Sequence, residues 1–321
     1  MSRPLRLGTR RSALAMAQAR RVADAINATS GRLVELVEIS TYGDVSKEAL
    51  AQIGGTGVFV SALRDTLLRG DVDLAVHSLK DLPTKDPEGL VLAAVPPRED
   101  PRDALVARDG LTLGELPPGS RVGTGSPRRA AQLAALGLGL DVIPIRGNVD
   151  TRLRMVSTGQ IDAVVLARAG LARLGRLDSI TEVIDPIQML PAPGQGALAV
   201  ECRAEDAEVL AVLRALDDPT TRAAVVAERA LLTALEAGCS APVGALADVA
   251  GDFAPGDNGA EDAGLTEPEL YLRGVVAAID GSSVVRLSAT GHPAAAEDVG
   301  HRLAAELLAA GANGLMGEHV P

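Results

Sequence analysis

The sequence predicts an α/β protein with two doubly wound lobes and a smaller C-terminal α+β domain, and three observations indicate this. From residue 5 to about 200, short β-branched runs alternate with helix-length amphipathic runs, a pattern typical of α/β layers with largely parallel sheets. Two Pro-rich segments, 96–102 and 186–196, interrupt the alternation. After about residue 218 the pattern changes to one long helix, three strands and a last helix.

The individual elements follow from hydrophobic periodicity and from the turn residues between them. Strands are expected at 5–8, 33–40, 72–76, 90–95, 103–107, 120–123, 141–145, 161–166 and 197–202, and then near 243–249, 270–279 and 283–289. Helices are expected at 12–29, 58–69, 127–137, 149–158, 168–174, 219–236 and 294–310.

The two Pro-rich segments predict two crossings between lobes. The first leads into the second lobe, and the second leads back, because the strand expected at 197–202 needs a sheet to join. Two crossings predict a two-lobed body with a cleft and a hinge. We therefore expect three domains, which comprise residues 1–98 with 197–216, residues 99–196, and residues 217–321.

The amino-acid composition argues against several classes of molecule as binding partners of this protein. The 321 residues carry a formal net charge of −11, which argues against nucleic acid and anionic membrane as partners. Only two Phe, two Tyr and no Trp occur, so base stacking on aromatic side chains is not expected. The longest uncharged stretches fall short of the roughly 20 apolar residues that a membrane helix needs. We expect no membrane partner.

The N-terminal segment faintly resembles a twin-arginine signal, because Arg10-Arg11 precede a short apolar run. Arg20-Arg21 end that run, so an amphipathic helix and a cytoplasmic location are the better interpretation. Cys202 and Cys239 are the two cysteines, and they indicate neither a disulfide framework nor a zinc site. No metal is expected.

Arginines stand where a helix normally disfavours cations. Ser126-Pro127 is a good helix start, and Arg128 and Arg129 follow in the first turn, where the helix dipole costs each cation about 0.3–1 kcal/mol. The pattern recurs in two further segments, at Arg146 to Arg152 with Asn148 as the expected N-cap, and at Arg10 to Ser12.

In a doubly wound sheet these three strand-to-helix turns meet at the carboxyl edge, facing the cleft. Residues 120–155 carry six Arg against two Asp. Free backbone N–H groups and guanidinium forks together favour an anionic ligand, a carboxylate or a phosphate. The alternative interpretation is a set of solvated surface arginines paired with nearby acids.

The segment after the expected strand at 72–76 offers a carboxylate at the same edge. Lys80 and Asp81 follow His77-Ser78 and precede Pro83. A carboxylate there could stabilise a developing cation or move a proton. Alternatively Asp81 only caps the turn before Pro83. His77 is interpreted as structural, since no His or Asp partner is legible around it.

Cys239 follows the long helix in an exposed turn, where Gly238 could be the left-handed residue that ends the helix and Pro242 stops its continuation. Local sequence alone does not favour a covalent role for Cys239 over a structural one. Cys202 is expected in the core. The Gly-rich run 54–57 is interpreted as a mobile loop beside the cleft, and the acidic segment 250–268 as a solvated loop.

Nine segments in order resemble the porphobilinogen deaminase (hydroxymethylbilane synthase) family over essentially the whole chain. They are LRLGTRRSALAMAQA, GGTGVFV, VHSLKDLPT, REDPRDA, VGTGSPRRAAQL, IRGNVDTRL, ARAGLARLG, LPAPGQGALAVECR and ERALLTALEAGCSAPVG. The resemblance implies a transferase of porphyrin, tetrapyrrole and haem biosynthesis. Such enzymes join four porphobilinogens head to tail, release ammonia at each step, and hydrolyse off linear hydroxymethylbilane (preuroporphyrinogen).

The resemblance also implies three domains, of which the first two are similar to periplasmic binding proteins, and a cytoplasmic monomer. It implies a dipyrromethane cofactor, self-assembled from two porphobilinogens and linked through sulfur to Cys239. Asp81 would be catalytic, helping the amine leave and stabilising the azafulvene cation. Cofactor-binding residues would be Cys239, Asp81, Lys80, Arg128, Arg129, Arg146 and Ser126; substrate-binding residues would be Arg10, Ser12, Arg146, Arg152, Arg173 and Phe59.

This chain departs from the family at Thr56 and Gln52, where many or some members have Lys, so its Gly-rich loop is not expected to supply a cation. Two other classes compete. A non-catalytic two-lobed anion-binding protein would use the arginines but would need neither Cys239 nor Asp81 nor a third domain. A pyridoxal-phosphate enzyme would need a Schiff-base lysine, and only Lys80 lies near the expected site.

Overall fold

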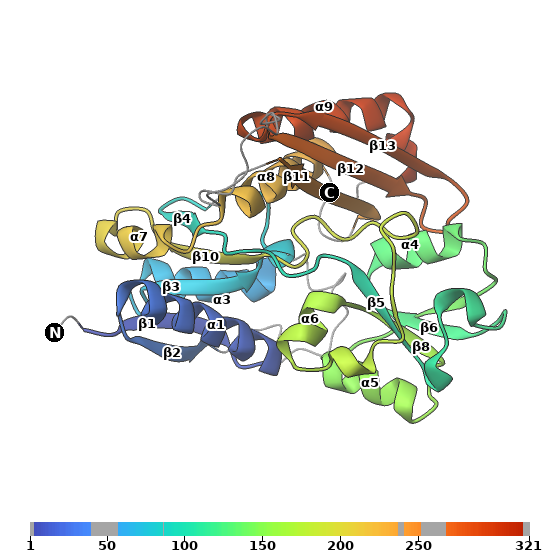
Figure 1. Cartoon of the computed structure of the whole chain (residues 1–321), viewed down its shortest axis with the longest axis horizontal. Coiled ribbons are helices and arrows are strands. Elements are labelled where there is room, and N and C mark those ends of the chain that lie inside the picture. Colours follow the sequence, from blue (N-terminus) through green and yellow to red (C-terminus); the bar gives the residue numbers. More distant parts are fainter. Residues whose placement is uncertain (1–2, 40–56, 86, 237–240, 252–267, 317–321) are drawn as a thin grey trace, which may run out of the picture.

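Three sheets organise the chain in the computed structural model, which describes residues 3–39, 57–85, 87–236, 241–251 and 268–316 (Figure 1). Two sheets have five strands, in the orders β2-β1-β3-β10-β4 and β7-β6-β8-β5-β9, and the third has three, in the order β11-β12-β13. The α/β fold class with two lobes and a smaller α+β unit is confirmed. None of the helices in these ranges is long and apolar enough to cross a bilayer.

The bounds of the elements are as follows. The first lobe contains β1 (Leu5–Arg10), α1 (Ala13–Ser30), β2 (Val34–Ile39), α3 (Gly57–Leu68), β3 (Leu74–Ser78), η1 (Leu79–Asp81), β4 (Leu90–Ala94), β10 (Leu198–Arg203) and α7 (Ala207–Arg214). The second contains β5 (Asp103–Ala107), β6 (Arg121–Thr124), α4 (Pro127–Ala135), β7 (Asp141–Pro144), α5 (Val149–Ser157), β8 (Ala163–Ala167), α6 (Arg168–Arg173) and β9 (Glu182–Val183). The third contains α8 (Pro219–Ala234), β11 (Val243–Ala250), β12 (Glu269–Ala277), β13 (Val284–Gly291) and α9 (Ala296–Ala309).

Both large sheets are mixed, which corrects the prediction of largely parallel sheets. β1 pairs in parallel with β2 and β3, and β6 pairs in parallel with β7 and β8. The strands that follow the two crossings, β5 and β10, run antiparallel to both of their neighbours. A chain that enters a lobe from the other lobe arrives from the hinge side, so its first strand runs against the others.

Two elements were not predicted. β9 has only two residues, too few to leave a periodic signal. α7 is short, and begins at Asp206, whose side chain accepts a hydrogen bond from the Val209 amide. The Ala207–Arg214 helix covers the same face of the first sheet as α1, so it completes that layer.

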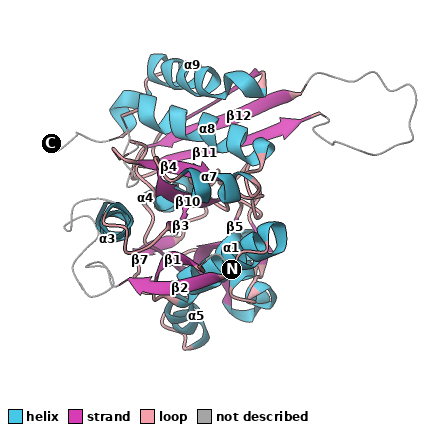
Figure 2. Ribbon diagram, turned by 90° about the vertical axis from the view of Figure 1, so that its left-hand side faces the viewer, coloured by secondary structure: helices cyan, strands magenta, loops and turns pink. Residues whose placement is uncertain are grey.

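Helices cover both faces of each large sheet. In the first lobe, α1 and α7 pack on one face and α3 packs on the other, through Leu63 and Leu67 (Figure 2). In the second lobe, α4 packs on one face through Leu133, while α5 and α6 pack on the other. This layering leaves the carboxyl ends of the parallel strands free to carry functional side chains.

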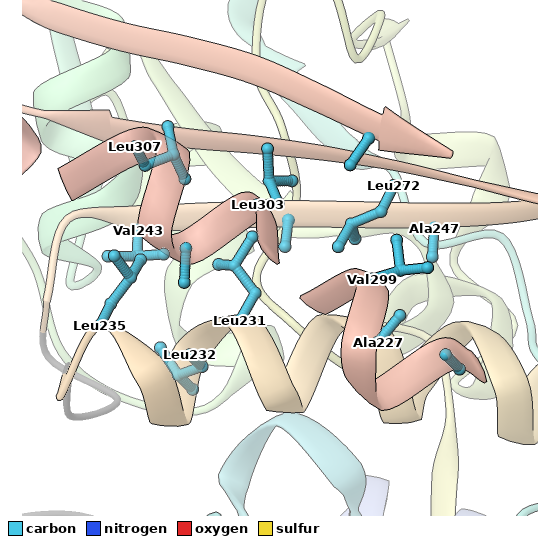
Figure 3. Close-up of a cluster of buried hydrophobic side chains, with 14 of the residues drawn as sticks. Ala227, Leu231, Leu232, Leu235, Val243, Ala247, Leu272, Val299, Leu303 and Leu307 are labelled. Carbon is cyan, nitrogen blue, oxygen red and sulfur yellow. The ribbon is translucent and has the colours of Figure 1, made fainter. Parts of the chain in front are cut away.

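The third sheet is covered on one face by α8 and α9. Leu231 of α8 and Leu303 of α9 are fully buried against Leu272 of β12 (Figure 3). The two helices approach closely at Gly300, where an added Cβ would lie 2.4 Å from the Ala227 carbonyl oxygen. A residue without a Cβ at position 300 therefore lets the two helix backbones come this close.

Candidate active site

Three helices begin at the carboxyl edge of the parallel strands, and two of their N-caps, Ser126 and Asn148, were predicted from the sequence. Ser12 caps α1, Ser126 caps α4 and Asn148 caps α5, each accepting a hydrogen bond from a backbone amide of the first turn. Because β6 and β7 are parallel, the starts of α4 and α5 lie at one edge of the second sheet. The predicted arginines around these caps therefore stand at the edge where ligands bind in such sheets.

Asp103 is a fully buried carboxylate that pairs with both first-turn arginines of α4. Its Oδ2 lies 2.8 Å from Arg128 Nη2, and its Oδ1 lies 3.0 Å from Arg129 Nε and 2.8 Å from Arg129 Nη2. Burial opposes ionisation, but the two guanidinium groups outweigh it and hold the pKa of the Asp103 carboxyl at about 2. Arg128 and Arg129 are only 3% and 5% exposed, so the solvated-surface interpretation is wrong for this pair.

The guanidinium groups of Arg128 and Arg129 share the single carboxylate of Asp103. Some of their remaining N–H groups donate to backbone carbonyls. Arg129 Nη1 donates to the Val165 carbonyl at 3.0 Å, and Arg128 Nη1 donates to the Leu190 carbonyl. Within the described part of the chain, the buried Nε of Arg128 has no hydrogen-bond partner. Burial lowers the pKa of Arg128 despite Asp103. The pair keeps a surplus of positive charge.

Gln195 connects the two lobes at this point. Its amide nitrogen donates to Asp103 Oδ1 at 2.8 Å and to the Pro101 carbonyl at 2.7 Å. Its amide oxygen accepts from Lys80 Nζ at 3.3 Å and from Arg129 Nη2 at 3.5 Å. Burial, together with Arg129, lowers the pKa of the Lys80 ammonium to about 8.

The sequence analysis did not single out Asp103 or Gln195. Both nevertheless lie in segments that carry the family resemblance, REDPRDA and LPAPGQGALAVECR. The sequence signal that could have identified them is a polar residue at each crossing between the lobes, because the two lobes must be in contact there.

Asp81 is the last residue of η1, and its side chain is exposed. The turn is closed by the backbone, with the Leu82 amide donating to the Leu79 carbonyl at 3.0 Å. Among the described residues the Asp81 carboxylate accepts no hydrogen bond, so it does not act as a cap there. Its charge does raise the pKa of Lys80, against the effects of burial and Arg129.

Arg146 and Arg152 extend the positive cluster. Arg152 Nε donates to the Gly147 carbonyl at 2.9 Å, and its pKa is lowered by burial and by the nearby charges of Arg129 and Arg146. Arg146 itself is exposed, and Arg10 is half-buried at the end of β1. The positive charges of Arg129, Arg146 and Arg152 therefore lie near one another.

Arg173 has different neighbours. It donates to the Gly196 carbonyl, and it lines a pocket of about 260 Å³ together with Arg21 of α1 and with Arg98 and Glu99 of the first crossing. Burial and Arg21 lower its pKa to about 10. The structure thus brings Arg173 together with α1 and the hinge.

Several predicted residues lie outside the described residues. These are Cys239 and Gly238, residues 54–56 of the Gly-rich run with Gln52, most of the acidic segment 250–268, and the side chain of Phe59. The described end of α8 differs from the expectation: the helix ends at Ala234, and the residue with a left-handed backbone is Glu236, at a φ of 52°.

The structural interpretation of His77 agrees with its surroundings. His77 is buried on β3, and its Nε2 lies 3.1 Å from the carboxylate of Glu201, which pairs with Arg64 at 2.7 Å. Cys202 is fully buried in the first-lobe core, as expected, and burial raises the pKa of its thiol to about 11. A thiol of this kind is inert at neutral pH.

Around Lys80, the cationic side chains in the described residues outnumber the carboxylates. The cations are Lys80, Arg128, Arg129, Arg146 and Arg152, and the carboxylates are Asp81 and Asp103. The described residues hold no group of three or more His, Cys, Asp or Glu that could bind a metal ion. Fold and site together define a two-lobed α/β protein with a cationic cluster beside an exposed carboxylate, an arrangement suited to a polyanionic ligand.

Comparison with known proteins gives the family. Residues 5–211 match the family model described as porphobilinogen deaminase, dipyromethane cofactor binding domain, and residues 222–309 match porphobilinogen deaminase, C-terminal domain. The chain belongs to the porphobilinogen deaminase family.

Curated relatives support this over nearly the whole length. Porphobilinogen deaminase 1 of Streptomyces coelicolor is 62% identical, covering 98% of each chain. Porphobilinogen deaminase of Mycobacterium tuberculosis is 60% identical, covering 97% of this chain and 98% of the relative. Among solved structures, the methionine binding protein MetQ is similar to this chain with a TM-score of 0.43 and 15% sequence identity. The match covers 66% of this chain and 89% of MetQ.

Proposed function

We propose that this chain is a hydroxymethylbilane synthase, an enzyme that condenses four porphobilinogens head to tail with loss of ammonia and releases the linear product by hydrolysis. One observation carries the proposal: a family match over both lobes and the third domain coincides with a cationic cluster beside the exposed carboxylate of Asp81. Each porphobilinogen bears an acetate and a propionate, so a growing chain of them is a polyanion. The surplus of guanidinium groups suits such a ligand.

The residues present fit a dipyrromethane cofactor, the group that the first family domain is named for. The buried Nε of Arg128 has no hydrogen-bond partner among the described residues, and two arginines share the one carboxylate of Asp103; a bound carboxylate would satisfy both. Lys80, Arg128, Arg129, Arg146 and Ser126 would hold the group's carboxylates, and Cys239 would carry it through sulfur. When bound, the cofactor supplies the terminal pyrrole carbon to which the first substrate is joined.

Asp81 is proposed as the catalytic residue. Its carboxylate is exposed at the carboxyl edge of β3, where it can lie beside a substrate pyrrole nitrogen. A negative charge there stabilises the positive charge that develops on the substrate ring as ammonia leaves, and it can hold the ring N–H proton. Substrate carboxylates would be bound by Arg10, Ser12, Arg146, Arg152 and Arg173, with Phe59 beside the ring.

Three further expectations stay predictions. A cytoplasmic location and a monomeric state are consistent with the substrate and with the family, and the three-domain division at residues 98, 196 and 216 is consistent with the three sheets. Limited proteolysis would test the division, because exposed linkers between domains are cleaved first.

The experiment that tests the function is the intact mass of the purified protein, followed by turnover of porphobilinogen. We expect a mass excess equal to two porphobilinogens less two ammonias, and its loss in Cys239→Ser. Asp81→Asn should keep the excess when the cofactor is preassembled, yet lose nearly all turnover. A wild-type protein that forms no adduct with porphobilinogen and has no turnover would favour the anion-binding alternative.

A further inference from the structure

The turn that carries Asp81 is positioned by its backbone. η1 begins where the Leu79 amide donates to the Ala197 carbonyl at 3.1 Å, and it closes where the Leu82 amide donates to the Leu79 carbonyl. No described residue donates a hydrogen bond to the Asp81 carboxylate itself. Whatever fixes the backbone after Asp81 therefore fixes where its carboxylate points.

Arg229 of α8 binds that backbone at three consecutive carbonyl groups. Its Nη1 donates to the Leu82 carbonyl at 3.3 Å, and its Nη2 donates to the carbonyls of Pro83 at 2.9 Å and Thr84 at 3.3 Å. Arg229 is half-buried, which makes these hydrogen bonds stronger than they would be in water. A planar guanidinium can reach three carbonyl oxygens at once, whereas an ammonium cannot do so with the same geometry.

The same face of α8 contacts the turn a second time. Val225 lies one helical turn before Arg229 and packs with the buried side chain of Leu82 in one apolar cluster. Helix α8 then runs to Ala234, five positions before Cys239. The Asp81 turn is thus held against α8 by both polar and apolar contacts, and α8 itself packs against α9.

We infer that Arg229 is a positioning residue for catalysis, one that fixes the Asp81 turn relative to α8. The inference rests on the proposed function of Asp81. Arg229 touches neither substrate nor cofactor in this role. It sets the place of a carboxylate to which no side chain in the described part of the protein donates a hydrogen bond, and a misplacement of about 1 Å is enough to cost on the order of a hundredfold in rate.

The test compares holoenzyme preparations of Arg229→Ala and Arg229→Lys with a matched control, Arg222→Ala. Arg222 stands on the same helix and is also half-buried, but it donates to the carbonyls of Leu92 and Ala93 on β4 and pairs with Asp217. Intact mass first establishes that each variant carries the cofactor. Steady-state kinetics with porphobilinogen and hydrogen exchange of the peptide 79–85 follow.

For Arg229→Ala we expect kcat to fall at least tenfold with KM within threefold of wild type, and amide exchange in 79–85 to become at least tenfold faster. Arg229→Lys should lie between Arg229→Ala and wild type in both measurements. Arg222→Ala should keep kcat and the exchange of 79–85 within twofold. If Arg229→Ala does not fold, Arg229→Lys and Arg222→Lys carry the same comparison.

Three results would overturn the inference. One is unchanged exchange of 79–85 in the Arg229 variants. Another is an equal loss of kcat in the Arg222 control. A third is a large rise in KM at constant kcat, which would make Arg229 a substrate-binding residue. A wild-type protein without adduct or turnover would instead refute the proposed function, and the exchange measurement would still test the Arg229 contact.

Discussion

The guanidinium of Arg98 and the carboxylate of Glu228 form a two-point ion pair at the place where both lobe crossings meet the third sheet. Arg98 Nη1 lies 2.7 Å from Glu228 Oε1, and Nη2 lies 3.0 Å from Oε2. The fully buried Glu228 also accepts from the Gly194 amide at 2.6 Å and from the Ala247 amide at 2.8 Å. One carboxylate on α8 therefore joins the first crossing, the second crossing and β11.

Removal of the Glu228 charge should destabilise the whole chain. In Glu228→Gln the Arg98 guanidinium stays buried without a counter-charge, which costs about 3–5 kcal/mol for a pair of this kind. We expect a loss of that size in the free energy of unfolding, measured by urea denaturation. Glu208→Gln is the control, because Glu208 is exposed and its pair with Arg32 contributes under about 1 kcal/mol. Equal losses in the two variants would contradict the assigned role.

Local features of this fold could be predicted because they depend on a few neighbouring residues. Ser126 and Asn148 were expected as helix N-caps, and each accepts the first-turn hydrogen bond that defines a cap. Strand direction could not be predicted in the same way. Hydrophobic periodicity records which side chains are buried, not whether a strand runs with or against its neighbour, so the antiparallel direction of β5 and β10 was not predicted.

The candidate site likewise has features that could be predicted from the sequence and features that could not. Misplaced first-turn arginines could be recognised from the sequence, because the helix dipole is a local property. Their buried partner Asp103 lies 26 positions before Arg129, and Gln195 lies 66 positions after it, so only the fold brings them together. The contact of Arg229 with the Asp81 turn spans about 145 positions and leaves no pattern in either segment.

The stability of the first lobe should fall in acid because of Glu201. Burial opposes ionisation of this carboxyl, but His77 and Arg64 outweigh it and hold its pKa at about 2, below the ordinary value of about 4.3. The stabilisation is thus complete above pH 4.3 and is lost as the pH falls toward 2. We expect the difference in unfolding free energy between wild type and Glu201→Gln to shrink by about 2 kcal/mol from pH 6 to pH 3. A constant difference would show that the charge of Glu201 does not matter.

Substitution of Gly300 by Ala should destabilise, although Gly→Ala in a helix ordinarily stabilises by about 0.5–1 kcal/mol. The new Cβ would lie 2.4 Å from the Ala227 carbonyl oxygen and 2.6 Å from the Ala230 Cβ, so α8 and α9 must move apart. Overpacking of this kind costs about 1–3 kcal/mol. Gly314→Ala is the control, because nothing lies within 4 Å of its added Cβ. Thermal unfolding should show a lower Tm only for Gly300→Ala.

The alkaline limb of the pH–rate profile should report Lys80. Burial, with Arg129, lowers the pKa of its ammonium to about 8, so the positive charge is present at pH 7 and is lost as the pH rises past 8. A neutral Lys80 attracts substrate carboxylates less, so kcat/KM should fall above pH 8. A bound anion favours the charged form of Lys80, so the alkaline decrease in kcat should occur at higher pH than the decrease in kcat/KM. Lys80→Arg should remove this limb, because guanidinium stays charged throughout the range. The exposed Lys85 gives the control variant Lys85→Arg, which should leave the profile unchanged. Wild type and the two variants act on the same substrate, so any titration of porphobilinogen itself affects all three profiles equally. An alkaline limb that persists unaltered in Lys80→Arg would exclude Lys80 as its source.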